Sequence, residues 1–130
     1  MRNYEDLEVW QKAHCLTLGL YRVTEGFPRS EMFGLTSQIR RSAGSIGANL
    51  AEGCGRWGDV ELARFVQIAM GSASELQYLL LRAQDLSYLK ADSHASLEEM
   101  TIEVKRMLAA LLRTLKSATN AGSRQLRADS

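Results

Sequence analysis

The strongest constraint on the fold of this chain is a long apolar repeat near its middle. Between residues 59 and 88, apolar and small side chains recur at alternating spacings of three and four residues without a break. Helices that pack side by side with a left-handed twist have this heptad seam. The seam consists of Leu62, Phe65, Ala69, Ser72, Leu76, Leu79, Ala83 and Leu86. It predicts a single helix about 45 Å long, at about 1.5 Å per residue.

The same periodicity predicts two helices before this one. The first covers residues 7–25, with Asp6 as its N-cap, and it ends before the chain's only proline, which disfavours helix in the preceding residue. The second covers residues 31–52, with Ser30 as its N-cap. Gly53 follows it directly, in the position where a C-terminal glycine commonly ends a helix.

A fourth helix completes the predicted fold. It begins after residue 93, where Ser96 and Glu99 fit a capping box, and it ends near residue 119. Residues 120–130 are expected to be a disordered tail. Four helices with short connections must lie antiparallel to their neighbours. We therefore expect residues 1–119 to form one all-α domain, an antiparallel up-down-up-down four-helix bundle.

Composition is consistent with a single globular domain. With 45% apolar residues the chain can bury a core without cross-links, so Cys15 and Cys54 are expected to be reduced packing residues. The N-terminus lacks an apolar secretory core, and no window approaches the ~20 apolar residues needed to span a bilayer. We expect a cytoplasmic protein with no membrane partner. The net charge of +1 implies no nucleic-acid partner by itself.

Small residues crowd the segment 38–56, which reads QIRRSAGSIGANLAEGCGR. Because exposed helix positions are normally filled by Lys, Glu and Gln, its many Ala, Gly and Ser residues predict a closely packed neighbouring helix or subunit. Gly47 lies inside the predicted helix at a cost of roughly 1 kcal/mol relative to Ala. Asn49 is expected to bond to a neighbouring helix and fix its register. Trp57, in the following loop, is expected to pack or to serve an interface.

No catalytic, cofactor or metal pattern is found. Residues 53–58 spell G-x-G-x-x-G, but a helix precedes them instead of the strand that a dinucleotide site needs, so we interpret them as a helix stop and turn. His14 and His94 lack ligand clusters, and the Glu-x-x-His motif of di-iron bundles is absent from the sequence. No Ser–His–Asp or Cys–His arrangement is indicated. We expect a protein that is not an enzyme and holds no cofactor or metal.

The order of several motifs resembles one known family. The motifs are LEVWQKA at 7–13, FGLTSQIRRSA at 33–43, SIGANLAEG at 45–53 and AMGSASEL at 69–76. They resemble the bacterial four-helix bundle family of 23S rRNA intervening-sequence proteins, also called the S23 family, over roughly residues 4–115. This chain departs from the pattern inside 45–49, where relatives often have Pro or Ser and Gly47 is expected to leave the same kink or close contact.

The resemblance implies an assembly of identical subunits. Members of the family look like homopentamers, and they are similar to the accessory protein of diversity-generating retroelements, a basic pentameric barrel that binds nucleic acid and its reverse transcriptase. A binding or scaffolding role is therefore implied, and no enzymatic activity.

Two roles remain open for the basic residues. Residues 28–56 carry four arginines against two glutamates, and a symmetric ring would repeat this excess in every subunit. The leading hypothesis is contact with RNA or DNA through Arg40, Arg41, Arg56, Lys105, Arg106 and Arg113. The alternative is a protein–protein scaffold in which arginines make intersubunit salt bridges to Glu52 or Glu75. Glu52, at the negative end of its helix dipole, needs a partner, and Arg56 lies one turn ahead.

Overall fold

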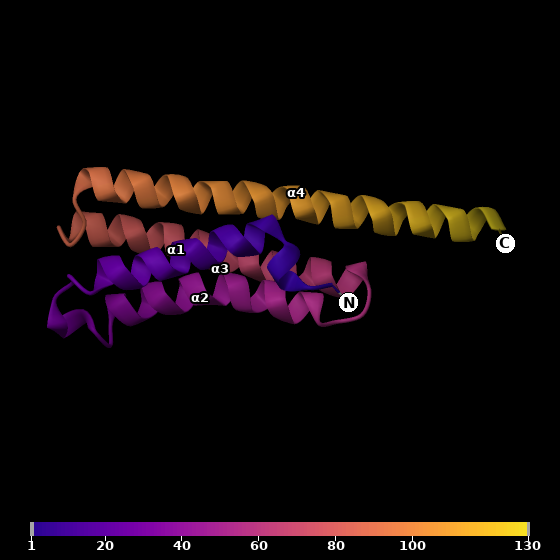
Figure 1. Cartoon of the computed structure of the whole chain (residues 1–130). Helices are drawn as coiled ribbons and strands as arrows, with labels where there is room; N and C mark the ends of the chain where they lie inside the picture. Colours follow the sequence, from indigo (N-terminus) through magenta and orange to yellow (C-terminus); the bar gives the residue numbers. More distant parts are fainter. Residues whose placement is uncertain (1, 130) are drawn as a thin grey trace.

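The chain folds into four long α-helices. The computed structural model describes residues 2–129, with side chains described through residue 122. The elements are η1 (Tyr4–Asp6), α1 (Glu8–Thr24), η2 (Arg29–Glu31), α2 (Leu35–Cys54), α3 (Asp59–Asp85) and α4 (Ala91–Asp129). Figure 1 shows that successive α-helices run in opposite directions. Residues 2–129 contain no strand, so the prediction of an all-α antiparallel bundle is confirmed.

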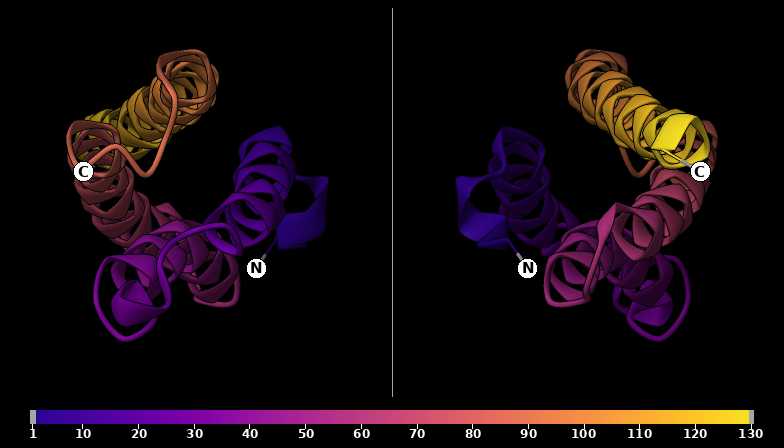
Figure 2. Two further views of the ribbon diagram at one scale, coloured as in Figure 1. Left: turned by 90° about the vertical axis from the view of Figure 1, so that its left-hand side faces the viewer. Right: turned by 90° about the vertical axis from the view of Figure 1, so that its right-hand side faces the viewer.

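The helices follow one another around the bundle. The most extensive helix packing is between α2 and α3 and between α3 and α4. Helix α1 packs on α2 and also contacts α4. Viewed along the helices, α2 and α3 lie between α1 and α4 (Figure 2). Within the described part of the chain the backbones of α2 and α4 are not neighbours. Side chains on these two helices therefore face different sides of the molecule unless they point into the core.

The heptad seam lies in the core as predicted. Six of its eight positions are buried: Leu62, Phe65, Ala69, Leu76, Leu79 and Ala83. The other helices contribute fully buried leucine, isoleucine and valine side chains, including Leu16, Leu20, Ile39, Ile46, Leu50, Val104, Leu108 and Leu115. Burying each large side chain contributes about 1.5–3 kcal/mol relative to leaving it exposed. Two seam positions differ from the prediction, because Ser72 is half-buried and Leu86 lies exposed at the end of α3.

The predicted helix starts are wrong in detail. Asp6 lies in η1, a separate turn that Asn3 caps, and it does not cap α1. Ser30 belongs to η2, and α2 begins only at Leu35. The Glu31 Oε1 atom accepts a hydrogen bond from the Leu35 backbone N–H at 3.3 Å. This side chain therefore serves the start of α2 from outside the helix, which the apolar period could not indicate.

The last helix is longer at both ends than predicted. It begins at Ala91, so Ser96 and Glu99 lie inside it and form no capping box at its start. It continues to Asp129, and the disordered tail predicted from residue 120 is helical in the structure, while Ser130 lies outside the described residues. No proline interrupts this segment, and its Ala, Leu, Gln and Arg residues favour helix.

Gly53 does not end α2 but lies buried inside it. The helix continues through Cys54 and is capped by Gly55, whose φ of −80° is ordinary right-handed backbone. A Cβ atom on Gly53 would lie 2.8 Å from Phe65 Cβ and 2.9 Å from Leu62 Cδ1. Glycine is needed here because α3 approaches the α2 backbone too closely for any side chain.

Two glycines in α2 should respond in opposite ways to alanine. Gly53→Ala should lower the free energy of unfolding by about 1–3 kcal/mol, since the new methyl group overpacks the α2–α3 contact. Gly44→Ala should raise it by up to about 1 kcal/mol, because a Cβ there meets nothing within 4 Å and alanine favours helix. Urea unfolding followed by circular dichroism measures both. Equal effects at the two positions would contradict the close approach at Gly53.

Candidate assembly and nucleic-acid surfaces

The six basic residues predicted to contact nucleic acid do not form one surface within a single chain. Arg40 and Arg41 lie on α2, Arg56 lies in the turn that follows, and the remaining three lie on α4. Because the backbones of α2 and α4 are not neighbours in the described part of the chain, the two groups lie on different sides of the bundle. A continuous basic patch is therefore not a property of one subunit.

Arg40 is tied to the neighbouring helix. Its Nε donates to the Thr24 Oγ1 at 2.9 Å, and its Nη2 donates to the Tyr21 carbonyl oxygen at 3.2 Å. Its guanidinium also lies 4.6 Å from the centre of the Tyr21 ring. These contacts hold the C-terminal turn of α1 on α2. Arg40 is thus a structural residue that bridges two helices.

Arg56 and Glu52 form an ion pair within the chain. Arg56 Nη2 lies 3.1 Å from Glu52 Oε1, and both side chains are about half exposed, at 50% and 52%. An exposed pair one helical turn apart contributes little to stability. The Arg56 guanidinium also lies 5.4 Å from the Phe65 ring centre, which Arg64 approaches to 4.4 Å. Of the partners that the sequence suggested for Glu52, the structure uses the local one.

The basic residues of α4 differ in their contacts. Lys105 Nζ donates to Gln77 Oε1 on α3 at 3.0 Å, and Arg106 lies 4.0 Å from Glu103 on its own helix. Arg113 is exposed, as is Arg41 on α2. Neither of these two arginines makes a side-chain hydrogen bond or ion pair with residues 2–122. Of the six predicted contact residues, Arg41 and Arg113 therefore have a charge that is available to a partner.

Among the described side chains, Asn49 bonds within its own helix and not, as predicted, to a neighbouring helix. Its Nδ2 donates to the carbonyl oxygen and to the Oγ of Ser45, at 2.8 and 2.9 Å, one turn earlier in α2. Ser45 makes the link between helices instead, because its Oγ lies 2.9 Å from Ser72 Oγ on α3. The amide thus orients a serine pair across the α2–α3 contact. The presence of Ser72 on an otherwise apolar seam was the sequence signal for this pair.

An aromatic cluster packs on the small residues of α2. A Cβ on Gly47 would lie 3.3 Å from Trp10 Nε1, so the indole of α1 rests against the glycine. The Trp10 ring stacks on His14 with centroids 4.9 Å apart and an angle of 10° between the planes, and Tyr4 packs edge to face with Trp10 at the same centroid distance. Beside it is a groove of about 240 Å³, hereafter the α1–α2 groove. Its lining residues are Tyr4, Trp10, His14, Thr17, Gly44, Gly47, Ala48 and Ala51.

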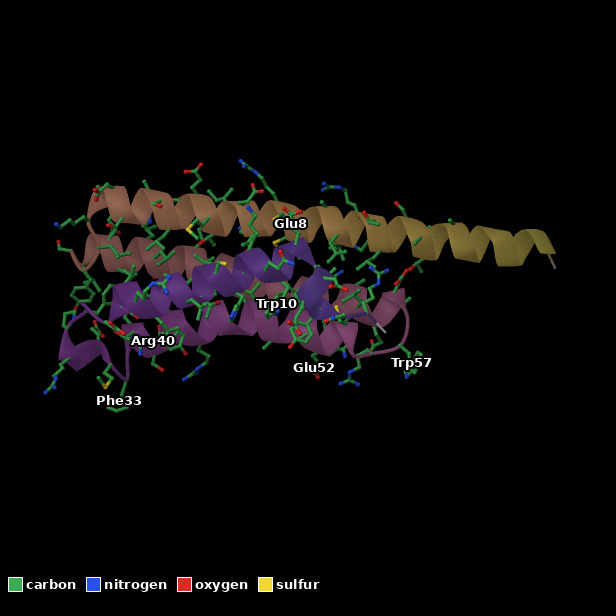
Figure 3. All side chains as sticks on the ribbon, in the orientation of Figure 1. Glu8, Trp10, Phe33, Arg40, Glu52 and Trp57 are labelled. Carbon is green, nitrogen blue, oxygen red and sulfur yellow. The ribbon has the colours of Figure 1, made fainter. Side chains whose placement is uncertain are left out.

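Two large aromatic side chains lie outside the core, near opposite ends of α2. Phe33, before the helix, is 94% exposed, and Trp57, after it, is 79% exposed. Figure 3 shows both side chains directed away from the bundle. Trp57 is therefore not a packing residue within the chain. The exposure of Phe33 could not be predicted from the sequence, because a phenylalanine near a helix start has the same pattern as a core residue.

Burial and hydrogen bonding shift the pKa values of Cys54 and Tyr88. Burial raises the pKa of the Cys54 thiol, with the nearby Arg2 charge opposing the shift, so Cys54 is a packing residue, whereas Cys15 is exposed. A hydrogen bond to Glu31, 3.0 Å away, raises the pKa of the Tyr88 phenol.

Among the described residues there is no group of three or more His, Cys, Asp or Glu side chains arranged to hold a metal ion. None of the described helices has both the length and the apolarity to cross a bilayer.

The sequence matches a protein family over most of its length. Residues 5–110 match the family described as 23S rRNA-intervening sequence protein. The chain belongs to this family. The match spans the four-helix core and leaves out the last part of α4, and it confirms the family resemblance of the motifs in α1, α2 and α3. No curated protein sequence matches the chain.

A solved structure shares the fold. It is the crystal structure of a protein with unknown function from the S23 ribosomal protein family of Bacteroides thetaiotaomicron. The two structures align with a TM-score of 0.75 at 22% sequence identity, over 81% of this chain and 95% of the other. At this identity the likeness concerns the fold alone, and it agrees with the four-helix architecture of the intervening-sequence protein family.

The adjacent arginines of α2 should differ in their effect on stability. Arg40→Ala should lower the free energy of unfolding by about 1–2 kcal/mol, because it removes two hydrogen bonds and the packing against Tyr21. Arg41→Ala should change it by less than about 0.5 kcal/mol, as expected for an exposed side chain. Thermal and urea unfolding of both variants test this. A decrease at Arg41 as large as the decrease at Arg40 would contradict the assigned roles.

Proposed function

We propose that this chain is a non-enzymatic helical bundle that self-assembles, with five copies as the family resemblance implies, and that the assembly binds nucleic acid through basic residues. The observation that carries the proposal is the exposure of Phe33 and Trp57 beside a filled core. Aromatic residues, Trp and Phe among them, are enriched at protein interfaces relative to the rest of the protein surface. Neither ring has a role inside the single chain.

The basic residues support nucleic acid as the partner of the assembly. Arg41 and Arg113 are exposed and lie on helices whose backbones are not neighbours within the described residues. One copy with a net charge of +1 offers only a weak field. Symmetry would repeat each arginine around the assembly and bring basic residues of different copies to a common surface. The family description names the 23S rRNA-intervening sequence, so RNA is the first ligand to test.

The alternative function is a protein–protein scaffold. In it, Arg41 pairs with a carboxylate of a neighbouring copy instead of a phosphate. Glu75 favours this alternative, because it is exposed on α3 and forms no ion pair with residues 2–122. Both proposals require self-assembly, and they differ in what Arg41 contacts. Removing its charge therefore separates them.

The proposal predicts salt-sensitive binding of RNA or DNA. The native protein should have a solution mass that is a multiple of the chain mass, and it should bind structured RNA or duplex DNA at low salt. Affinity should fall linearly on a double-logarithmic plot against salt, because binding releases counterions. The double variant Arg41→Ala/Arg113→Ala should keep the mass, bind more weakly and lower the slope by about one for each phosphate that is no longer neutralised.

A double variant of equal charge change provides the control. Arg22→Ala/Lys90→Ala removes two exposed positive charges outside the proposed binding residues. It should retain most of the affinity and the slope. Loss of assembly in the double variant Arg41→Ala/Arg113→Ala would favour the protein–protein scaffold. A monomeric native protein would contradict self-assembly, and absence of binding to both nucleic acids at low salt would contradict the nucleic-acid role.

A further inference from the structure

Phe33 is an exposed ring on a braced turn. The Gly34 backbone N–H donates to the Glu31 carbonyl oxygen at 3.0 Å, and the Leu35 N–H donates to the Glu31 carboxylate at 3.3 Å. The other carboxylate oxygen of Glu31 accepts from the Tyr88 hydroxyl at 3.0 Å. Glu31 thus connects the residues after Phe33 to the end of α3. These bonds hold the backbone next to Phe33 in place, which reduces the backbone entropy lost when the ring binds a partner.

The α1–α2 groove has the size and the lining for such a ring. Its volume of about 240 Å³ exceeds the roughly 150 Å³ that accommodates a benzene molecule in a protein cavity. One wall is the cluster of Tyr4, Trp10 and His14, and α2 contributes only Gly and Ala residues to the opposite side. Aromatic rings pack favourably edge to face, so this wall suits a further aromatic side chain.

The phenylalanine of the same chain cannot occupy this groove. From Leu35 to Gly47 the helix rises about 18 Å, at about 1.5 Å per residue. Figure 3 shows Phe33 at one end of the bundle and Trp10 well along its length. A chain that carries both features at such a separation can pair them only with another copy of itself.

The charges around the two features are complementary. Arg29, four residues before Phe33, is exposed and makes no side-chain hydrogen bond or ion pair with residues 2–122. Glu52 lies one helical turn after Ala48, at the rim of the groove, and only its Oε1 contacts Arg56. Its Oε2 can accept a bond from a second cation. A neighbouring Arg29 would bring the opposite charge to this rim.

We propose that Phe33 of one copy inserts into the α1–α2 groove of the next copy. The inference rests on the self-assembly proposed above and identifies the contact that drives it. The two surfaces differ, so the contact is heterologous: it closes into a ring where the rotation between copies closes, and it otherwise extends into a filament. The offset of about 18 Å between ring and groove requires neighbouring bundles to be inclined or staggered.

Two single variants test the two halves of the interface. Phe33→Ala removes the ring, and Gly44→Leu fills the groove from α2. Both should convert the native assembly into a folded monomer, measured by light scattering after size-exclusion chromatography. Gly44→Leu should also raise the monomer's melting temperature, because a Cβ at Gly44 meets nothing within 4 Å and leucine favours helix. The control Leu81→Ala removes a 46% exposed apolar side chain from α3 and should leave the mass unchanged.

A mixing experiment decides whether the ring and the groove meet. Phe33→Ala retains an open groove, and Gly44→Leu retains the ring, so an equimolar mixture should form a complex of one copy each and grow no further. Native mass spectrometry with one variant isotope-labelled identifies this complex. A mixture that stays monomeric, or that rebuilds the full assembly, overturns the proposal.

The outcomes separate this inference from the proposed function. If the native protein assembles and Phe33→Ala assembles equally well, the phenylalanine contact is wrong while self-assembly stands. If the native protein is a monomer, both are wrong. Circular dichroism of each variant establishes that a change of mass does not come from unfolding.

Discussion

The close contact between α2 and α3 is the interaction on which the rest of this structure depends. Gly53 lets the α3 residues Leu62 and Phe65 approach the α2 backbone. Farther along the same contact, the paired hydroxyl groups of Ser45 and Ser72 satisfy each other across the helices. The remaining helices pack on the two sides of this pair, α4 on α3 and α1 on α2. Small and polar residues here serve the approach of two backbones, while leucine and isoleucine fill the surrounding core.

This arrangement explains why α2 carries an unusual surface. A helix in contact with α3 on one side and with Trp10 on another has few positions left for long side chains. Arg40 bridges to α1, and Arg41 points to solvent, although the two are adjacent in sequence. Adjacent residues on a helix point about 100° apart, so one arginine can stabilise the fold while the other remains available. The same geometry ties Arg40 to α1 and leaves Arg41 exposed.

The exposure of Phe33 and Trp57 contrasts with the well-buried core of the bundle. Phe33 is exposed although the bundle has an apolar core of buried leucine, isoleucine and valine side chains. Its turn is held by the Glu31 hydrogen bonds that connect α2 to the end of α3. An exposed ring on a braced turn and an aromatic-walled groove on one molecule support the proposal that copies of this chain bind one another. In the proposed assembly, α2 would contribute to both sides of each interface.

The sequence by itself determined the helical class, the number of helices and most of the core. These follow from the 3-4 spacing of apolar residues. A helix that buries one face needs apolar residues at that spacing, so the spacing predicted the burial of Leu62, Ala69 and Leu76. The resemblance in the motifs likewise identified the family.

Only the tertiary structure decided how individual polar and small residues are used. Gly53 is suited to ending a helix and equally to a close approach, and the position of Phe65 selected the second. Asn49 bonds to its own helix, Glu52 pairs with Arg56, and Phe33 lies outside the core. A hydrogen bond or an exposed ring depends on which residues distant in sequence come within a few ångströms. Periodicity places each residue on one face of its helix, and the packing of the helices then determines what that face meets.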